Sequence, residues 1–319
     1  MRWSYIPRWK FTDSCGRPGV PGALHLGCAH DAHAECHHAT RREFLKAGVA
    51  IAGAAGFATV VDPREVFAQV RVFPPPPPEV SPIAGLMDTH VHAAPDVFGR
   101  SMDDEEVAIL YKERGLEALV LKNHVVATAD RAWFARKHVA GLKVFGGIVL
   151  NSAVGGINPD AVNWMWRMQG GFGRVVWFPT HLSPTEALAV IEAGRDAGVS
   201  RLVVTHAQFE VVNMSLAQME KAASMGAKLE LCAMGTLMGP EAHLAWMRHW
   251  RRVKVEETAA AVKQLGAQNF VLATDLGQTG NPSPADGLQL FVTDLMTAGV
   301  SKDDVTKMGR EVTGSLLMG

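Results

Sequence analysis

The stretch Asp88-Thr89-His90-Val91-His92 closes the first apolar run that follows Gly85. Alternate residues of a β-strand share one face, so we expect Asp88, His90 and His92 to point the same way. The two histidines of such a strand lie about 6–7 Å apart along it, which lets both imidazoles reach one ion at about 2.0–2.1 Å. Polar side chains on an inward face would otherwise be costly to bury. The pattern therefore predicts a metal site at the end of this strand.

Short apolar runs alternate with amphipathic stretches through the rest of the chain. The apolar runs are 86–92, 118–124, 142–150, 174–178, 201–205, 227–232 and 269–274. Helical patterns between them include 103–114, 159–168, 184–197, 215–225 and 255–265. This alternation predicts a parallel sheet covered by helices. We expect an α/β fold, a TIM-like (β/α)₈ barrel that is distorted or short of one strand, because only seven runs are counted. A doubly wound sheet is disfavoured, since no glycine-rich phosphate loop follows the first strand.

The composition is that of an ordinary globular protein. Of 319 residues, 48% are hydrophobic and 20% are charged, with a formal net charge of −1. This excludes a mostly disordered, collagen-like or polytopic membrane chain. The near-neutral charge argues against nucleic acid as a partner, because no basic excess is available to neutralise phosphates.

Metal-competent side chains gather at the carboxyl ends of the apolar runs. They are His90, His92, His124, His181, His206 and Asp275. Barrel enzymes build their active sites at that rim of the sheet.

These residues resemble the motifs of the amidohydrolase superfamily, over residues 86–278. The resemblance implies metal-dependent hydrolysis on a barrel, with the strand-one histidines and a last-strand aspartate binding one ion. It implies that His90, His92 and Asp275 are metal ligands, followed by His181 and His206, which bind a second ion or orient the substrate carbonyl. One or two divalent ions are expected, zinc first, with manganese and iron as alternatives. Asp275, with His206, is the expected catalytic residue, taking the proton of the attacking water.

Two departures from the family pattern concern His181 and Lys122. His181 follows residues 174–178 almost directly, where the family would fit another strand and helix. The family's bridging lysine usually ends strand four, whereas Lys122 lies on the second run. Lys122 is interpreted as an anchor for a substrate carboxylate, with a carbamate bridge or a salt bridge to Asp88 as alternatives. His124 shares its face and is a candidate ligand or substrate contact.

Apart from Asp88, Glu230 is the only acid inside an apolar run. An unpaired carboxylate there would be expensive, so Glu230 is expected to touch the water at the metal, a substrate group or Lys122, or to form a structural ion pair. Cys232 is interpreted as a core residue. The remaining histidines near tryptophan and arginine are expected to be surface or packing residues: His138, His243 and His249.

The first 84 residues have the organisation of an exported precursor. Residues 40–46, with Arg41-Arg42, resemble a twin-arginine (Tat) signal, and the uncharged stretch 47–61 is typical of a signal-peptide core. We predict a Tat-type signal over 40–68, a proline-rich linker over 69–84 and the hydrolase barrel over 85–319. Export implies the Tat translocase as a partner, a periplasmic or secreted location and no stable membrane span.

Residues 1–39 contain three cysteines and five histidines. A metal-binding tract is one interpretation; a disordered extension or a start codon assigned too far upstream is favoured, because the spacings match no zinc finger.

Amides, esters and lactones of small molecules all suit this chemistry, as does the decarboxylation that some superfamily members carry out. Two other functions stay open. A seven-stranded metal phosphoesterase fits the strand count, and a non-catalytic periplasmic metal- or solute-binding protein fits the exported histidine cluster. The oligomeric state is left open.

Overall fold

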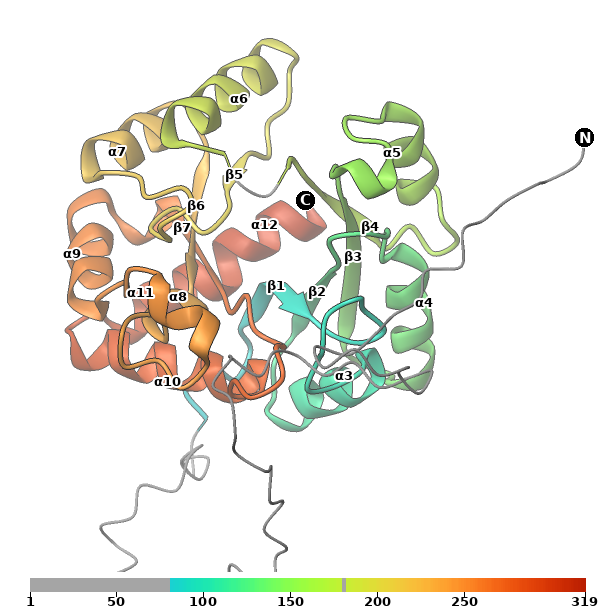
Figure 1. The fold of residues 1–319 in the computed structure, drawn as a ribbon, viewed down its shortest axis with the longest axis horizontal. Helices are drawn as coiled ribbons and strands as arrows, with labels where there is room; N and C mark the ends of the chain where they lie inside the picture. Colours follow the sequence, from blue (N-terminus) through green and yellow to red (C-terminus); the bar gives the residue numbers. More distant parts are fainter. Residues whose placement is uncertain (1–80, 180–181) are drawn as a thin grey trace, which may run out of the picture. The chain divides into compact units, whose positions relative to one another are not determined.

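The computed structural model describes residues 81–179 and 182–319, in which strands alternate with helices (Figure 1). The predicted extension, signal and nearly all of the linker lie outside these residues, as does His181. Each of the seven predicted apolar runs contains a strand. The strands are β1 (Met87–His92), β2 (Ala118–Lys122), β3 (Lys143–Val149), β4 (Gly173–Trp177), β5 (Val203–Val204), β6 (Lys228–Cys232) and β7 (Phe270–Ala273).

The strands form an incompletely closed barrel. One sheet has the order β1-β2-β3-β4 and the other β5-β6-β7, all in parallel. A parallel bridge from Val91 to Leu276 joins β1 to the end of β7, and Asp275 N donates to His90 O over 2.8 Å. Within the described residues, β4 and β5 are not paired. The chain therefore forms a TIM-type barrel with one strand position vacant between β4 and β5, which confirms the predicted fold.

Helices lie around the strands and at their two ends (Figure 1). They are α3 (Asp104–Glu113), α4 (Ala129–His138), α5 (Pro159–Trp166), α6 (Pro184–Asp196), α7 (Leu216–Ser224), α8 (Ala233–Thr236), α9 (Val255–Leu265), α10 (Pro284–Thr297), α11 (Lys302–Thr306) and α12 (Thr313–Met318), with a π-helix at Lys307–Val312. Capping boxes precede α3, α6 and α7. The side chains of the N-cap residues Asp103, Ser183 and Ser215 accept backbone N–H groups that the first turn of each helix leaves free. Among residues 81–179 and 182–319, no helix is long and apolar enough to cross a membrane.

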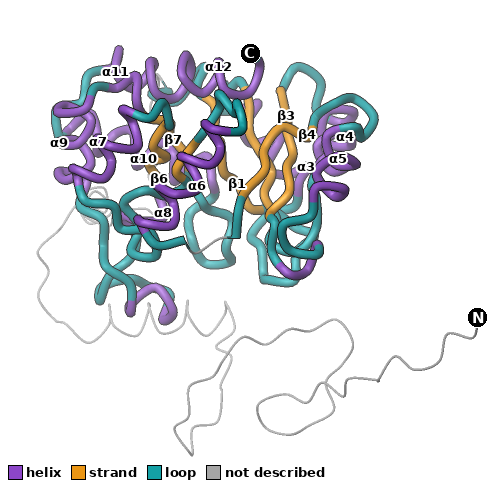
Figure 2. Tube along the Cα trace, turned by 90° about the horizontal axis from the view of Figure 1, so that it is seen from above, coloured by secondary structure: helices purple, strands orange, loops and turns teal. Residues whose placement is uncertain are grey.

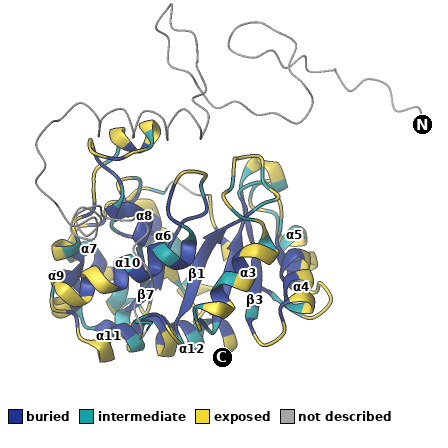
Figure 3. Cartoon of the chain, turned by 90° about the horizontal axis from the view of Figure 1, so that it is seen from below, coloured by how far each residue is buried: buried dark blue, intermediate teal, exposed yellow. Residues whose placement is uncertain are grey.

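The buried apolar side chains of the described residues form three clusters, two of which include residues of β1. The larger lies between strands and outer helices, where Val91, Tyr111 and Leu272 are buried, and the strands are dark blue while outer helix faces are yellow in Figure 3. The smaller includes Met87, Val120 and Leu317. Leu317 belongs to α12, which contacts the start of β1, and α12 and α8 lie at opposite ends of the strands (Figure 2). The polar site occupies the end away from α12.

A bulge in β1 changes the predicted orientation of Asp88. Asp88 pairs with Leu119 and Val91 with Leu121, so β1 contains one extra residue between these pairs. Strict alternation therefore fails, and the expectation that Asp88 shares the inward face of the two histidines is wrong. Instead, its carboxylate accepts the hydroxyls of Tyr111 and Thr274, each over 2.7 Å. The suggested salt bridge from Lys122 to Asp88 is therefore also disfavoured.

Candidate metal centre

Polar side chains converge at the carboxyl ends of β1, β6 and β7. His90 and His92 end β1, Glu230 lies on β6, and Asp275 follows β7. All four are buried, with exposed fractions between 0% and 6%. Such a set of buried polar groups is costly unless the groups pair with one another or hold an ion.

Two carboxylates lie close to the ring nitrogens of His90, one on each side of the ring. Its Nδ1 lies 3.0 Å from Glu230 Oε1, and its Nε2 lies 2.9 Å from Asp275 Oδ1. The first contact has hydrogen-bond geometry, whereas the buried Nε2 has no hydrogen-bond partner among the described residues. If Nδ1 carries the proton, the Nε2 lone pair faces Asp275. Burial alone would lower the pKa of His90, but Asp275 and Glu230 together raise it above its ordinary value.

The same carboxylate oxygen of Asp275 reaches the second histidine. His92 Nε2 lies 3.2 Å from Asp275 Oδ1, and the His90 and His92 ring centroids are 5.2 Å apart. Ligand atoms around a tetrahedral ion with bonds of about 2.0–2.1 Å lie about 3.3 Å from one another. The observed distances from Asp275 to both rings are close to that value. His90, His92 and Asp275 therefore fit a divalent ion, and their ligand atoms all lie within 4.8 Å of one another.

Arg100 contacts this group, and its part was not foreseen from the sequence. Its Nη2 lies 3.2 Å from His92 Nδ1, and Asp96 holds the guanidinium through a side-chain ion pair of 2.7 Å. A donor at Nδ1 favours the tautomer with the proton on Nε2, where it faces Asp275. Arg100 therefore opposes the tautomer that a metal ligand needs. The signal in the sequence is weak, because Arg100 lies in the irregular segment between β1 and α3.

Glu230 accepts hydrogen bonds from several residues of the site. Besides His90, its carboxylate accepts Thr89 Oγ1 over 3.2 Å, the backbone N–H of His206 over 3.2 Å and Cys232 Sγ over 3.1 Å. Burial would raise the pKa of Glu230, but the charge and hydrogen bond of His90, with smaller effects of His206 and Cys232, lower it to about 2. Burial and Glu230 also hold the pKa of the Cys232 thiol well above its usual range. Cys232 is thus a half-buried donor to Glu230 rather than the core residue that was expected.

Backbone strain is concentrated at two of the polar residues. His206 and Asp275 have φ values of 39° and 55°, in the left-handed region that residues with a side chain rarely adopt. Each lies two residues beyond the carboxyl end of its strand, β5 or β7, where the chain turns away from the sheet. Gly277 supports the arrangement, since a Cβ atom there would lie 1.8 Å from His92 O.

Lys122 and His124 both reach the same region from β2. The Lys122 ammonium lies 5.3 Å from the Trp177 ring centroid, and the His124 ring stacks on His92 at 4.9 Å. Lys122 is 2% exposed, and burial lowers its pKa despite the nearby carboxylates of Asp275 and Glu230. Burial also lowers the pKa of His124 to about 4, which leaves its imidazole neutral. Trp177 was not foreseen as a site residue.

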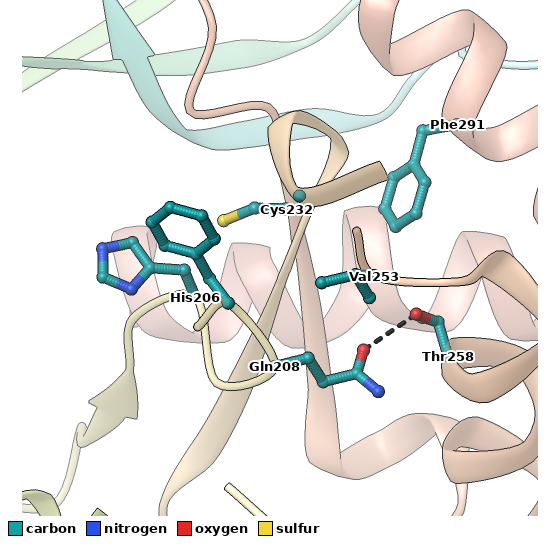
Figure 4. Close-up of a pocket in the computed structure, with 8 residues that line it drawn as sticks. His206, Gln208, Cys232, Val253, Thr258 and Phe291 are labelled. Carbon is teal, nitrogen blue, oxygen red and sulfur yellow. Dashed lines mark hydrogen bonds between the residues drawn. The ribbon is translucent and has the colours of Figure 1, made fainter. Parts of the chain in front are cut away.

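His206 lies beside His90 but outside the group of three ligand candidates. The two ring centroids are 6.0 Å apart, and burial lowers the pKa of His206 to about 4. Its buried Nδ1 has no hydrogen-bond partner among the described residues. Figure 4 shows the His206 ring beside a small pocket that Cys232, Val253 and Phe291 also line.

The other sequence candidates are distributed as follows. His138, His243 and His249 are exposed, and none of them belongs to the group of ligand candidates. His181 cannot be placed, since it lies outside the described residues.

Comparison with solved structures supports the fold. A protein from Pseudomonas putida, assigned as a 2-pyrone-4,6-dicarboxylic acid hydrolase, has a similar structure with a TM-score of 0.50 and 12% sequence identity. The match covers 73% of this chain and 97% of that protein. The chain has a TIM-type barrel fold. A dihydroorotase (TM-score 0.49, 13% identity, 73% and 69% covered) and an enamidase described as a member of the amidohydrolase superfamily (0.47, 13%, 73% and 67%) are similar at a lower level.

Comparison of sequences assigns no function. Residues 85–181 and 180–230 match the model of a family of unknown function, DUF6282. No curated protein matches the chain.

Proposed function

We propose that the protein is a metal-dependent hydrolase that acts on an amide, ester or lactone carbonyl of a small molecule. The convergence of His90 Nε2, His92 Nε2 and Asp275 Oδ1 supports this proposal most directly. The barrel fold and the position of these atoms at the carboxyl ends of its strands are in keeping with it. A divalent ion bound there, with zinc expected, supplies Lewis acidity that polarises a carbonyl oxygen and lowers the pKa of water.

The residues of the chain have separate tasks in this chemistry. Asp275 accepts the proton of the attacking water on its carboxylate and returns it to the leaving group. The nearby rings of His90 and His92 keep the pKa of Asp275 well below its usual range although burial would raise it, so its carboxylate is ionised. Glu230 fixes the tautomer of His90 through Nδ1. In this proposal Lys122 anchors a carboxylate of the substrate.

The test compares metal content and hydrolysis in the full-length chain. We expect one or two equivalents of a divalent metal by mass spectrometry, with loss of most of it in a His90→Ala/His92→Ala variant. His138→Ala/His249→Ala removes two exposed histidines and is the matched control, which should keep its metal. A panel of esters, lactones and amides is then assayed before and after chelation. Hydrolysis that disappears with the metal supports the proposal, whereas metal without turnover on any carbonyl substrate would leave a binding protein.

The other functions differ in what they require of the site. A phosphoesterase with three ions needs more acidic ligands than the two carboxylates, Asp275 and Glu230, that the described residues bring to the histidines. We therefore favour hydrolysis over the phosphoesterase. A decarboxylase would instead release carbon dioxide from an aryl or vinyl carboxylate, and such acids are assayed beside the panel of esters, lactones and amides.

The location is a separate part of the proposal. We propose that the chain leaves the cytoplasm through the Tat translocase, on the strength of Arg41-Arg42 and the uncharged stretch after them. N-terminal sequencing of the protein from a periplasmic fraction should begin at Gln69. Retention in the cytoplasm, unchanged by Arg41→Lys/Arg42→Lys, would contradict it.

A further inference from the structure

A cavity of about 650 Å³ occupies the vacant strand position between β4 and β5. We call it the β4–β5 cleft. Its walls come from β4, α6, β5 and α12. They include Val176, Phe178, Ala187, Val199 and Val203. A strand in that position would fill this space in a fully closed barrel, so the missing strand opens a side entrance to the interior.

The outer part of the β4–β5 cleft is apolar and open to solvent. Val176, Phe178, Val199 and Val203 are between 38% and 48% exposed. Large apolar side chains that gather at a cavity mouth mark a binding surface more often than an inert one. The mouth therefore suits an apolar group that leaves water.

The inner end of the cleft is polar and reaches the candidate metal centre. Lys122, His206, Glu230 and Thr89 line it. The Thr89 hydroxyl already donates a hydrogen bond to Glu230, and Glu230 also accepts a hydrogen bond from His90. The groups left for a ligand are then Lys122, which is buried above Trp177, and the ring of His206, whose buried Nδ1 has no hydrogen-bond partner among the described residues. Both can donate a hydrogen bond, so the matching ligand atom is a carbonyl or carboxylate oxygen.

We propose that the β4–β5 cleft binds the substrate, an elongated apolar acyl compound whose carbonyl end lies between Lys122 and His206. This rests on the proposed hydrolase function and adds its substrate class: esters or amides of medium-chain or aryl-alkyl carboxylic acids. The alkyl or aryl-alkyl part of the substrate lies along the apolar walls. The substrate enters through the side of the barrel.

The first experiment measures binding of the acid product, so that it does not depend on turnover. Calorimetry is done with butanoate, hexanoate and octanoate, on the full-length chain both metal-loaded and chelated. Each added methylene that leaves water should tighten binding about fourfold. Octanol is the comparison for the carboxylate, and Lys122→Met should abolish the preference for octanoate over octanol while the dependence on chain length remains.

Two pairs of variants locate the binding site. Ala187→Phe fills the cleft from α6, whereas Ala189→Phe adds the same bulk to an exposed position of that helix. Val199→Glu places a charge at the mouth, and Ile157→Glu does so at an exposed position that does not line the cleft. Ala187→Phe and Val199→Glu should each weaken octanoate binding about tenfold or more, because the first removes space and the second places a charge against the apolar chain of the ligand. The two controls should bind as the native chain does.

The outcomes separate this inference from the proposed function. One outcome is that binding depends on chain length and is weakened by Val199→Glu, but no acyl ester is hydrolysed. This would support the proposed ligand class and contradict the proposed hydrolase function. Metal-dependent hydrolysis that is indifferent to chain length and to Ala187→Phe would retain the hydrolase and overturn the cleft. A dimer that Val199→Glu dissociates, with octanoate affinity unchanged, would assign the surface to a second copy of the chain and also overturn the proposal.

Discussion

Glu230 Oε1 lies 3.0 Å from His90 Nδ1, on the side of the ring opposite Asp275. A buried carboxylate in this position fixes the ring and makes the other nitrogen a better metal ligand. We predict that Glu230→Gln lowers metal affinity by about 10–100-fold, the range found for such partners of ligating histidines. Competition with a chelator measures it. Cys232→Ser, which changes only another donor to Glu230, is the control and should change the affinity little. Equal affinities of Glu230→Gln and native protein would contradict the assignment of His90 as a ligand.

Arg100 should lower the affinity for the metal, whereas Glu230 raises it. Its guanidinium donates to His92 Nδ1 and places a positive charge beside the site. Replacing it with glutamine removes that charge and leaves a weaker neutral donor, so Arg100→Gln should tighten metal binding by up to about tenfold, the equivalent of about one hydrogen bond. Asp96→Asn, which leaves the guanidinium present, should not tighten it. If Arg100→Gln instead weakens binding, His92 Nε2 is not a ligand.

The hydrogen bond from Tyr111 to Asp88 should contribute to stability. The Tyr111 hydroxyl is buried and donates to a carboxylate that is 0% exposed. Tyr111→Phe removes that donor and leaves part of a buried charge without a partner, which costs about 1–3 kcal/mol. Urea unfolding of the chelated protein measures the loss. Ile109→Val, at a 42% exposed position of the same helix, should be nearly neutral.

Asp88 should also make stability depend on pH. Burial raises its pKa from 3.8 to about 6, although Tyr111 and Thr274 oppose the rise. The folded chain therefore binds this proton more tightly than the unfolded chain. The contribution of Asp88 to the free energy of unfolding is fully present below pH 3.8 and falls as pH rises through about 6, by about 3 kcal/mol in all.

The measurement is the difference in unfolding free energy between native protein and Asp88→Asn at several pH values. Other titrating groups largely cancel in that difference. A difference that stays constant between about pH 4 and about pH 7 would show that the pKa of Asp88 is the same in both states.

The positions of all seven strands could be predicted from the sequence, because each is a short apolar run bounded by turn residues. The meeting of His90, His92 and Asp275 followed from a general rule, since the carboxyl ends of parallel strands share one edge. The bulge in β1 could not be predicted, because an extra residue leaves the apolar pattern of Met87 and Val91 nearly unchanged while it turns Asp88 outward.

The contacts of Arg100 and Trp177 were also beyond the sequence. Arg100 reaches His92 from an irregular segment whose path depends on pairing with the residues after β7. Trp177 ends an apolar strand, where an aromatic residue ordinarily signals nothing but packing. The vacant position beside β4 was indicated only as a missing strand, and its location between β4 and β5 required the structure.

The missing pairing of β4 with β5 gives the barrel the mechanics of a split ring. A closed hoop of hydrogen bonds resists any change of its circumference, whereas a split ring widens at its gap by a small rotation at the opposite side. Here the opposite side includes the seam of β1 with β7, where His90 O accepts Asp275 N. A molecule that spreads the gap would therefore act on the spacing of the residues proposed to hold the ion, without breaking any bond of the two sheets.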